Sequence, residues 1–238
     1  MAKNIVYHYC SVDTFYSIIT NKTLRLSDLN KTNDYAEKIW SYKAIKKAIV
    51  EIIEELTNEM KEYKEIKYPV IEECVDTIER KIIEVLKNNI LTLIVCFSKK
   101  QDKLSQWRGY GDDGKGVSIG FDLDKLELLK GGEYNSNFKD FFNIKVEPVI
   151  YKDKEQYEVI KENLYRIVKF ENDVLFKDTK YDKKSLKIFN GNTEAINKSC
   201  ILNNLVDKTE EYVKYLLPLC CFMKNKEFSE ESEYRILY

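Results

Sequence analysis

The sequence holds a single histidine in 238 residues, and imidazole is the side chain best suited to acid–base chemistry near neutral pH. This residue, His8, lies in the apolar and aromatic run Ile5–Ser11, which predicts a short strand leading into a helix that begins near Val12. Side chains at strand ends commonly face a cleft. We therefore expect His8 to belong to a functional site.

Two carboxylates near the end of the sequence form the second candidate. Glu231 and Glu233 are two residues apart, so they point to the same side if a strand has already begun. Carboxylates held together raise each other's pKa or share a cationic partner, and such a pair suits a site that stabilises positive charge and accepts a proton. In the alternative interpretation, which the residues alone favour, they form a solvated strand entry with Arg235 as an ion-pair partner.

The third candidate is an aromatic pair in the segment 103–110, which is predicted to be a short helix. Trp107 and Tyr110 share a helical face beside Arg108, an arrangement that can stack on a planar ring or bind an anionic group. Alternatively, Trp107 fills the core. The glycine-rich residues 111–116 that follow fit neither the P-loop nor the dinucleotide fingerprint, so we predict a turn there.

Strands and helices alternate in the pattern that must position these residues. Strands are predicted at 23–27, 91–98, 117–121, 144–151 and 219–223, with Pro148 indicating an edge or a bulge. Helical periodicity covers 35–89, with a break at Tyr68–Pro69, and then 154–173 and 194–216, where Pro218 is expected to end the helix, while 177–192 is expected to be a loop. We predict an α+β fold in one domain, 1–238: a mixed or split antiparallel sheet with flanking helices, and a solvated helical hairpin inserted at 35–89.

Composition excludes several classes of function. With 39 basic and 40 acidic residues interleaved, the chain has no strong field for nucleic acid or an anionic membrane. Six cysteines lack the close pairs of zinc sites, so we expect reduced thiols and no metal site. No secretory signal is visible, and the longest apolar stretch, 90–97, is too short to span a bilayer, so a cytoplasmic protein is expected.

Three blocks of the sequence resemble the bacterial family called domain of unknown function 2971. The blocks are Tyr7-His8-Tyr9 with Ser11 and the Asn33-Asp34 turn, Cys96-Phe97-Ser98 through Trp107, Tyr110, Gly116 and Ile119-Gly120-Phe121, and Glu231-x-Glu233-Tyr234-Arg235. They occur in the family's order and extend from one end of the chain to the other. The family itself implies no function.

The opening block, with Phe15, Ile18, Ile19 and Leu24–Ser27, also resembles the start of the ADP-ribosyltransferase fold. That resemblance implies NAD as a substrate: His8 would bind a ribose hydroxyl, Tyr110 or Trp107 would stack on nicotinamide, and Glu233 would hold the 2′-hydroxyl. Glu231 resembles the first member of a Glu-x-Glu pair. Tyr9, Ser11, Arg108 and Arg235 complete the expected cofactor-binding set.

The leading functional hypothesis is therefore NAD-dependent ADP-ribosyl transfer or NAD cleavage, and by analogy a toxin or an antiviral effector. The balanced charge identifies no acceptor, although nucleic acid stays among the candidates. A second hypothesis is a module that senses a nucleotide without reacting it. In a third, the helical hairpin binds a partner protein. The sequence does not decide whether Glu231 or Glu233 is essential.

Overall fold

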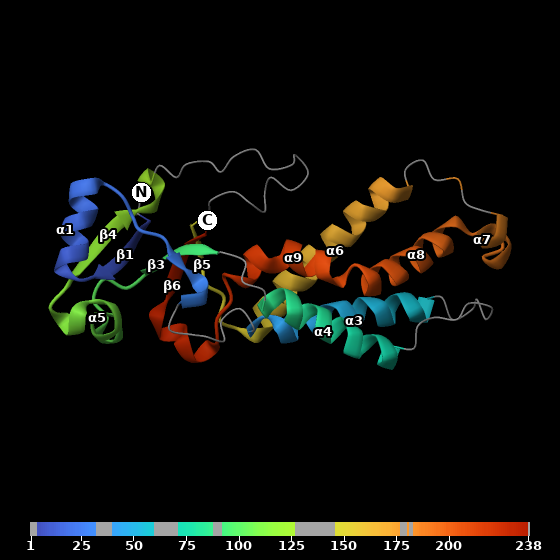
Figure 1. Ribbon diagram of the computed structural model, residues 1–238, viewed down its shortest axis with the longest axis horizontal. Helices are drawn as coiled ribbons and strands as arrows, with labels where there is room; N and C mark the ends of the chain where they lie inside the picture. Colours follow the sequence, from blue (N-terminus) through green and yellow to red (C-terminus); the bar gives the residue numbers. More distant parts are fainter. Residues whose placement is uncertain are drawn as a thin grey trace. The chain divides into compact units, whose positions relative to one another are not determined.

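The structure is a computed structural model that describes residues 4–31, 40–59, 71–87, 92–126, 146–176, 180 and 183–237. Contacts between residues divide the chain into two compact units. Unit 1 comprises 1–38, 89–152 and 220–238, and unit 2 comprises 39–88 and 153–219. Figure 1 labels the elements of both units. The predicted break at Tyr68–Pro69 lies outside the described residues.

Unit 1 contains a six-stranded sheet in which all paired strands are antiparallel, so the expected α+β class is confirmed. The order is β4-β1-β3-β6-β5, and β2 pairs with β3 outside this path. Their bounds are β1 Ile5–Cys10, β2 Ser27–Asp28, β3 Leu93–Ser98, β4 Val117–Asp122, β5 Val146–Pro148 and β6 Glu233–Leu237. Pro148 lies in the edge strand β5, as predicted, where its missing N–H costs no ladder hydrogen bond.

The sheet presents a core face and a polar face, because successive side chains of a strand point to opposite sides. Val6, Val95, Phe97 and Ile236 are buried together and define the core face. The strand register places the polar face on their neighbours: Tyr7 lies opposite Ser98, which lies opposite Glu233, and Cys96 lies opposite Arg235. A smaller apolar cluster lies partly on the polar face. Leu29, Ile94 and Cys221 are buried in it, and Cys96 and Leu237 pack against them. Of these, Ile94 and Cys96 of β3 and Leu237 of β6 occupy polar-face positions.

One edge of β3 is shared by two strands that do not meet. Strand β6 pairs with Ile94–Ser98 of β3 along its other edge. On the shared edge, β1 pairs with β3 only at Tyr7–Ser98, and β2 pairs with it only at Leu93 and Ile94. The three residues between, Val95 to Phe97, therefore face a gap between β1 and β2.

The segment 23–27 forms less strand than predicted, yet its side chains alternate as expected. The ladder covers only Ser27 and Asp28, and the chain before it is extended without strand pairing. Leu24 and Leu26 nevertheless pack against the core-face cluster. Burial of the two leucines fixes which side of the chain faces the core even where strand hydrogen bonds are absent.

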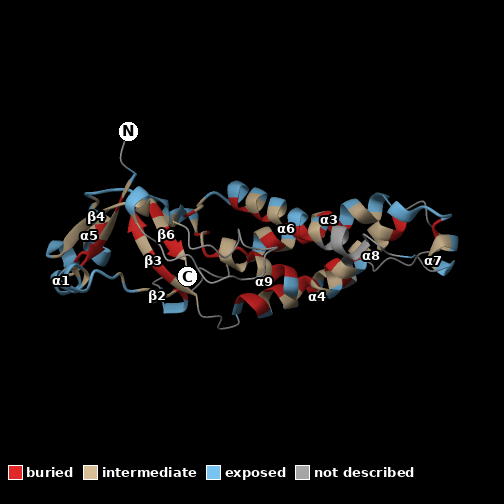
Figure 2. Cartoon of the chain, turned by 90° about the horizontal axis from the view of Figure 1, so that it is seen from above, coloured by how far each residue is buried: buried red, intermediate tan, exposed pale blue. Residues whose placement is uncertain are grey.

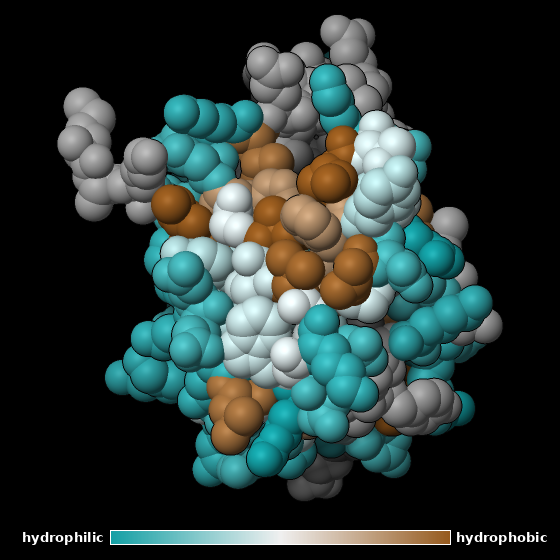
Figure 3. Space-filling view, turned by 90° about the vertical axis from the view of Figure 1, so that its left-hand side faces the viewer, coloured by the Kyte–Doolittle hydropathy of each residue, from teal (hydrophilic) through white to brown (hydrophobic). Residues whose placement is uncertain are grey.

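Helix α1, Val12–Asn21, follows Ser11, whose side chain caps it by accepting from the backbone N–H of Thr14. Helix α1 buries none of its residues, and Val12, Tyr16 and Ile19 are more than half exposed. Apolar side chains gather on this side of the molecule (Figure 3). Helix α1 packs against β4.

Unit 2 is helical. Helix α3, Tyr42–Glu59, packs against α4, Ile71–Lys87, as the predicted hairpin requires, and also against α6, Asp153–Phe176, and α8, Thr193–Asp207. The buried face of α3 points toward these helices while the outer faces are exposed (Figure 2). Ion pairs join neighbouring helices: Lys46 with Glu79, and Lys161 with Glu51. The hairpin thus shares one core with the helices that follow residue 152.

The later part of the chain differs from three predictions. Helix α7, Lys183–Ile188, forms within the expected loop 177–192. The expected helix 194–216 is two helices, α8 and α9, Thr209–Cys220, separated at Lys208. Pro218 does not end α9, because a proline in the last turn removes only one helical hydrogen bond. Residues 219–223 were predicted to be a strand, but Cys220 ends α9 and only Met223 forms a bridge, with Ile150.

Candidate functional site

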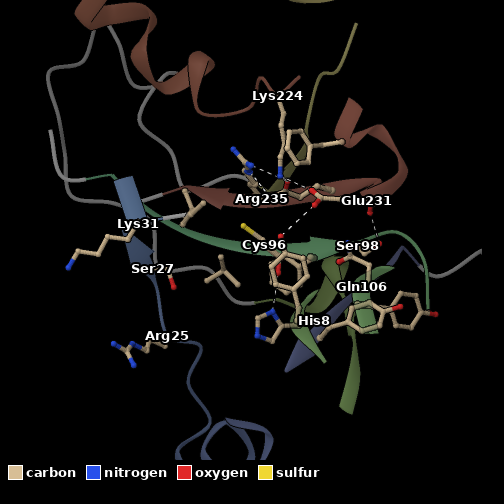
Figure 4. Close-up of a pocket in the computed structure, with 18 residues that line it drawn as sticks. His8, Arg25, Ser27, Lys31, Cys96, Ser98, Gln106, Lys224, Glu231 and Arg235 are labelled. Atoms are coloured by element: carbon tan, nitrogen blue, oxygen red, sulfur yellow. Dashed lines mark hydrogen bonds and ion pairs between the residues drawn. The ribbon is translucent and has the colours of Figure 1, made fainter. Parts of the chain in front are cut away.

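A cavity of about 280 Å³ opens on the polar face of the unit 1 sheet. Its volume is near the lower end of the range for small-molecule sites, roughly 300 to 1,000 Å³. Strands β1, β3 and β6 line it together with helix α5, Leu104–Tyr110, the turn η4, Lys226–Glu231, and the segment 25–31 (Figure 4). The expected site residues among its lining are His8, Tyr9, Tyr110, Glu231, Glu233 and Arg235.

Glu233 is the first residue of β6, and ion pairs hold both of its carboxylate oxygens. The Arg235 guanidinium donates from Nε to Oε1 at 2.6 Å and from Nη2 to Oε2 at 3.0 Å, and Lys224 Nζ lies 3.2 Å from Oε2. Burial of the carboxyl acts to raise the pKa of Glu233, but the two cations outweigh it and the pKa is lowered. Arg235 is 1% exposed and also donates to the Cys221 carbonyl. Glu233 is therefore ionised and fixed.

Glu231 lies in η4, outside the strand. Ser232, in the left-handed region with φ of 47°, turns the chain before β6 begins, so strand alternation does not pair the two glutamates as the sequence suggested. They instead share Lys224, whose Nζ is 2.7 Å from Glu231 Oε2. Burial raises the pKa of Glu231 despite this contact. Its other oxygen, Oε1, lies 3.5 Å from the Tyr110 hydroxyl, on the cavity side.

Lys224 is a central residue of the site that sequence analysis missed. It is only 6% exposed, and its ammonium lies 4.8 Å from the centre of the Phe228 ring. In the sequence it follows the apolar run 219–223, and a lysine next to such a run, seven residues before a glutamate pair, was the available signal. The backbone N–H of Lys224 donates to the Ile150 carbonyl, which fixes the base of the side chain.

His8 occupies the gap along the edge of β3. Strand alternation sends its side chain toward the core face, where its ring meets Phe97 edge to face at 5.8 Å. Its Nδ1 is 3.0 Å from the Cys96 carbonyl oxygen, which belongs to the part of β3 that neither β1 nor β2 pairs. The imidazole thus takes the place of a strand hydrogen bond, and through the gap it lines the cavity.

The hydrogen bond also fixes the proton of His8. A carbonyl oxygen only accepts, so Nδ1 carries the hydrogen and Nε2 keeps a lone pair. Burial lowers the pKa of His8, and the bond to Cys96 opposes that shift only in part. His8 is consequently a neutral imidazole at pH 7 with one nitrogen able to accept a hydrogen bond or a proton.

Three expected cofactor-binding residues do not line the cavity. The Trp107 ring packs edge to face on Tyr9 at 4.9 Å, and its Nε1 donates to Asp102, but Trp107 is only partly buried and so does not fill the core either. Ser11 caps α1, and Arg108 is exposed on α5. Tyr9 lines the cavity, but its hydroxyl is held between the Lys100 carbonyl and the Lys103 backbone N–H.

The remaining lining was not anticipated from the sequence. Arg25, Ser27 and Lys31 enter from the segment around β2, and Cys96 and Ser98 enter from β3. Their neighbours in space are distant in sequence, so no local pattern identifies them. The exception is the alternation at 23–27, which correctly separates Leu24 and Leu26 from the positions between them.

Within the described residues, no helix is both long enough and apolar enough to cross a membrane. Comparison with curated proteins finds no match, and neither does comparison with solved structures.

A family model does match, over residues 106–236, which is more than half of the chain. The matched region includes η4 and most of α5 and β6, and with them Tyr110, Lys224 and both glutamates. It leaves out β1, β2 and β3, and also His8 and Arg25, which line the same cavity. The chain belongs to the family described as Protein of unknown function (DUF2971).

Proposed function

We propose that the cavity binds NAD or a related nucleotide and that unit 1 breaks the bond between nicotinamide and ribose, for ADP-ribosyl transfer or for hydrolysis. The observation that carries the proposal is the convergence of Glu231, with a raised pKa, and neutral His8 on one cavity. Groups whose environments move their pKa values in opposite directions are typical of acid–base sites. An ADP-ribosyltransferase-like arrangement of the sheet is part of the same proposal.

The chemistry requires few groups. When the bond between ribose C1′ and the nicotinamide nitrogen breaks, its electron pair leaves with nicotinamide, which departs neutral, and the ribose gains oxocarbenium character. A carboxylate fixed beside C1′ lowers that barrier electrostatically. Water or an acceptor hydroxyl then forms the new bond to C1′, and its proton passes to a carboxylate.

Geometry favours Glu231 over Glu233 for this task. Both oxygens of Glu233 are bound by Arg235 and Lys224, whereas Oε1 of Glu231 is bound by neither cation. In this proposal Glu233 acts as a positioning residue that holds Lys224 beside Glu231. The resemblance to the ADP-ribosyltransferase fold implies instead that Glu233 contacts the ribose.

His8 and Tyr110 supply the remaining contacts. The free Nε2 of His8 accepts a hydrogen bond from a ribose hydroxyl, and the half-exposed ring of Tyr110 offers a stacking surface for nicotinamide. A cytoplasmic role as a toxin or an antiviral effector belongs to the proposal by analogy, and the acceptor is left open between water, protein and nucleic acid.

The test follows nicotinamide release from NAD by the full chain. Glu231→Gln should lower the rate by about 100-fold or more, since loss of one preorganised group costs roughly 10²–10³ in kcat. The matched control is Glu230→Gln, the preceding residue, which is exposed and does not line the cavity. An equal rate in Glu231→Gln and the parent chain would contradict the assignment.

A second function, nucleotide sensing without turnover, is favoured by one observation. The fixed ion pairs of Glu233 leave β6 without a free carboxylate for ribose. Calorimetry separates the two functions: NAD binding without nicotinamide release, in the presence and absence of candidate acceptors, supports the sensor. Release that depends on Glu231 supports the enzyme.

A further inference from the structure

We propose that Arg25 and Lys31 form a phosphate-binding end of the cavity, so that its ligand carries a phosphate or diphosphate group. The inference rests on the proposed function only in placing the sugar beside His8 and Glu231. Neither cation belongs to the region matched by the family model. Figure 4 shows both side chains extending from the segment around β2, on the opposite side of the cavity from Glu231.

The backbone that carries Arg25 is held by its neighbours. Leu24 and Leu26 pack into the core-face cluster, which turns Arg25 and Ser27 to the other side, where both line the cavity. Ser27 pairs with Ile94 in the sheet. Arg25 is thus exposed, while the residues before and after it in the chain, Leu24 and Leu26, are held by the core.

Lys31 is anchored by a different set of contacts. Leu29 is 2% exposed and packs with Ile94 and Cys221, and its N–H donates to the Thr92 carbonyl. The Asp28 carboxylate accepts from both the backbone N–H and the side-chain amide of Asn30, closing a local turn. The short helix η1, Leu29–Lys31, therefore has a fixed start, and Lys31 extends from its end.

Charge at the cavity is opposite to that of the whole chain. The chain has a formal net charge of -1, but the cavity is lined by four cations and only two carboxylates. Glu231 and Glu233 bind Lys224 and Arg235. Among the described residues, no carboxylate forms an ion pair with Arg25 or Lys31. No described carboxylate therefore neutralises the two positive charges at this end of the cavity.

Two uncompensated cations match a diphosphate better than a neutral or a cationic group. Guanidinium binds phosphate oxygens through paired hydrogen bonds, and lysine adds a point charge. The opposite end, with neutral His8 and the Tyr110 ring, suits a sugar and an aromatic base. The combination selects nucleoside phosphates and diphosphate-linked dinucleotides over free nucleosides.

The test measures binding of ADP-ribose by calorimetry, because ADP-ribose keeps the diphosphate but lacks the bond to nicotinamide. Arg25→Gln with Lys31→Gln should weaken binding by about 10- to 100-fold, the usual effect of losing hydrogen bonds to a charged group. Binding by the parent chain should also weaken with added salt, and more steeply than binding by the double variant. The matched control, Arg108→Gln with Lys115→Gln, removes two cations that do not line the cavity and should bind normally.

The outcomes separate this inference from the proposed function. Unchanged affinity in the Arg25 and Lys31 double variant, or no binding of ADP-ribose by the parent chain, overturns the phosphate end even if NAD is cleaved. Binding of ADP-ribose that requires Arg25 and Lys31, with no nicotinamide release, supports the phosphate end and contradicts the enzyme. Nicotinamide riboside, which has no phosphate, should bind the parent chain and the double variant equally.

Discussion

The two faces of the unit 1 sheet are built by the same strands but are held together by different interactions. On the core face, Val6, Val95, Phe97 and Ile236 form one apolar cluster. On the polar face, the neighbouring residues Glu233 and Arg235 are equally buried, yet each depends on specific atoms of the other and of Lys224. The core face is specified by the volumes of its side chains, whereas the polar face is specified by defined pairs of hydrogen-bond donors and acceptors.

This difference determines how each face responds to substitution. An apolar core tolerates a residue of similar size, because its contacts have no direction. A buried ion pair does not tolerate the loss of one member, because the other charge is left in a poorly solvating environment. A substitution by a residue of similar size should therefore destabilise the protein much more on the polar face than on the core face.

The largest expected effect is that of Arg235→Met. The substitution leaves Glu233 buried with Lys224 alone and removes the donor to the Cys221 carbonyl, so unfolding free energy should fall by about 3–5 kcal/mol. Chemical denaturation measures it. Combining Glu233→Leu with Arg235→Met should recover most of the loss, and a double variant as unstable as the single one would show that the ion pair is not the cause.

The neighbouring residue on the core face gives a smaller effect. Ile236→Val removes one buried methylene and should cost about 0.5–1.5 kcal/mol in the same measurement. Nicotinamide release and ADP-ribose affinity should stay as in the parent chain. A change in the rate of nicotinamide release or in the affinity for ADP-ribose would show that packing on the core face affects the site on the polar face, which would contradict the proposed difference between the two faces.

A still more local effect is expected at the start of α1. Ser11→Ala removes the side-chain acceptor for the Thr14 N–H and should cost about 1 kcal/mol or less, because α1 is exposed. Ligand affinity should not change, since Ser11 caps the helix and does not line the cavity. Weaker ADP-ribose binding in this variant would restore Ser11 to the site.

The smallest expected effect is the pH dependence of stability that results from His8, which contacts Phe97 on the core face and also lines the cavity. Burial lowers the pKa of His8 below its usual 6.5, so the unfolded chain binds the proton more readily than the folded chain. Its stabilising contribution is present above pH 6.5 and is lost as the pH falls through the lower, folded value. The imidazole signal in NMR, the only one in this sequence, should titrate below pH 6.5.

His8→Asn serves as the control for this prediction. Its amide can still donate to the Cys96 carbonyl, but it does not titrate. The stability difference between pH 7.5 and pH 5.5 should be smaller in the variant, while the contributions of Glu231 and Glu233 stay in both proteins. An imidazole midpoint at or above 6.5 would contradict the burial argument.

Local patterns were sufficient to predict much of the fold. The alternating and β-branched runs indicated β1, β3 and β4, and Pro148 indicated an edge or a bulge, of which the structure has the edge. An error arose at Pro218, past which α9 continues. In α1, the apolar residues Val12, Tyr16 and Ile19 stay more than half exposed. Periodicity identifies an apolar face but not whether another element covers it.

The candidate site was predictable in part for a similar reason. The two glutamates and His8 were found from their residue types, and the structure places them on one cavity. Arg235 was expected as an ion-pair partner, and it binds Glu233. The partner of His8 was not found, because its contact with Cys96 spans 88 residues. The turn at Ser232, with its positive φ, changed how Glu231 and Glu233 are paired. No feature of the serine itself indicates that conformation.

The gap between β1 and β2 has a consequence for ligand size. Because both strands pair with one edge of β3, the length of β3 between Ile94 and Ser98 sets the spacing between His8 and Arg25, and the intervening chain, most of which is α1, only connects the two strands. This helix buries none of its residues, so its length can change with little effect on the core. Insertions or deletions between residues 12 and 22 should therefore leave the distance between His8 and Arg25 unchanged, because β3 holds the strands at both ends of this segment.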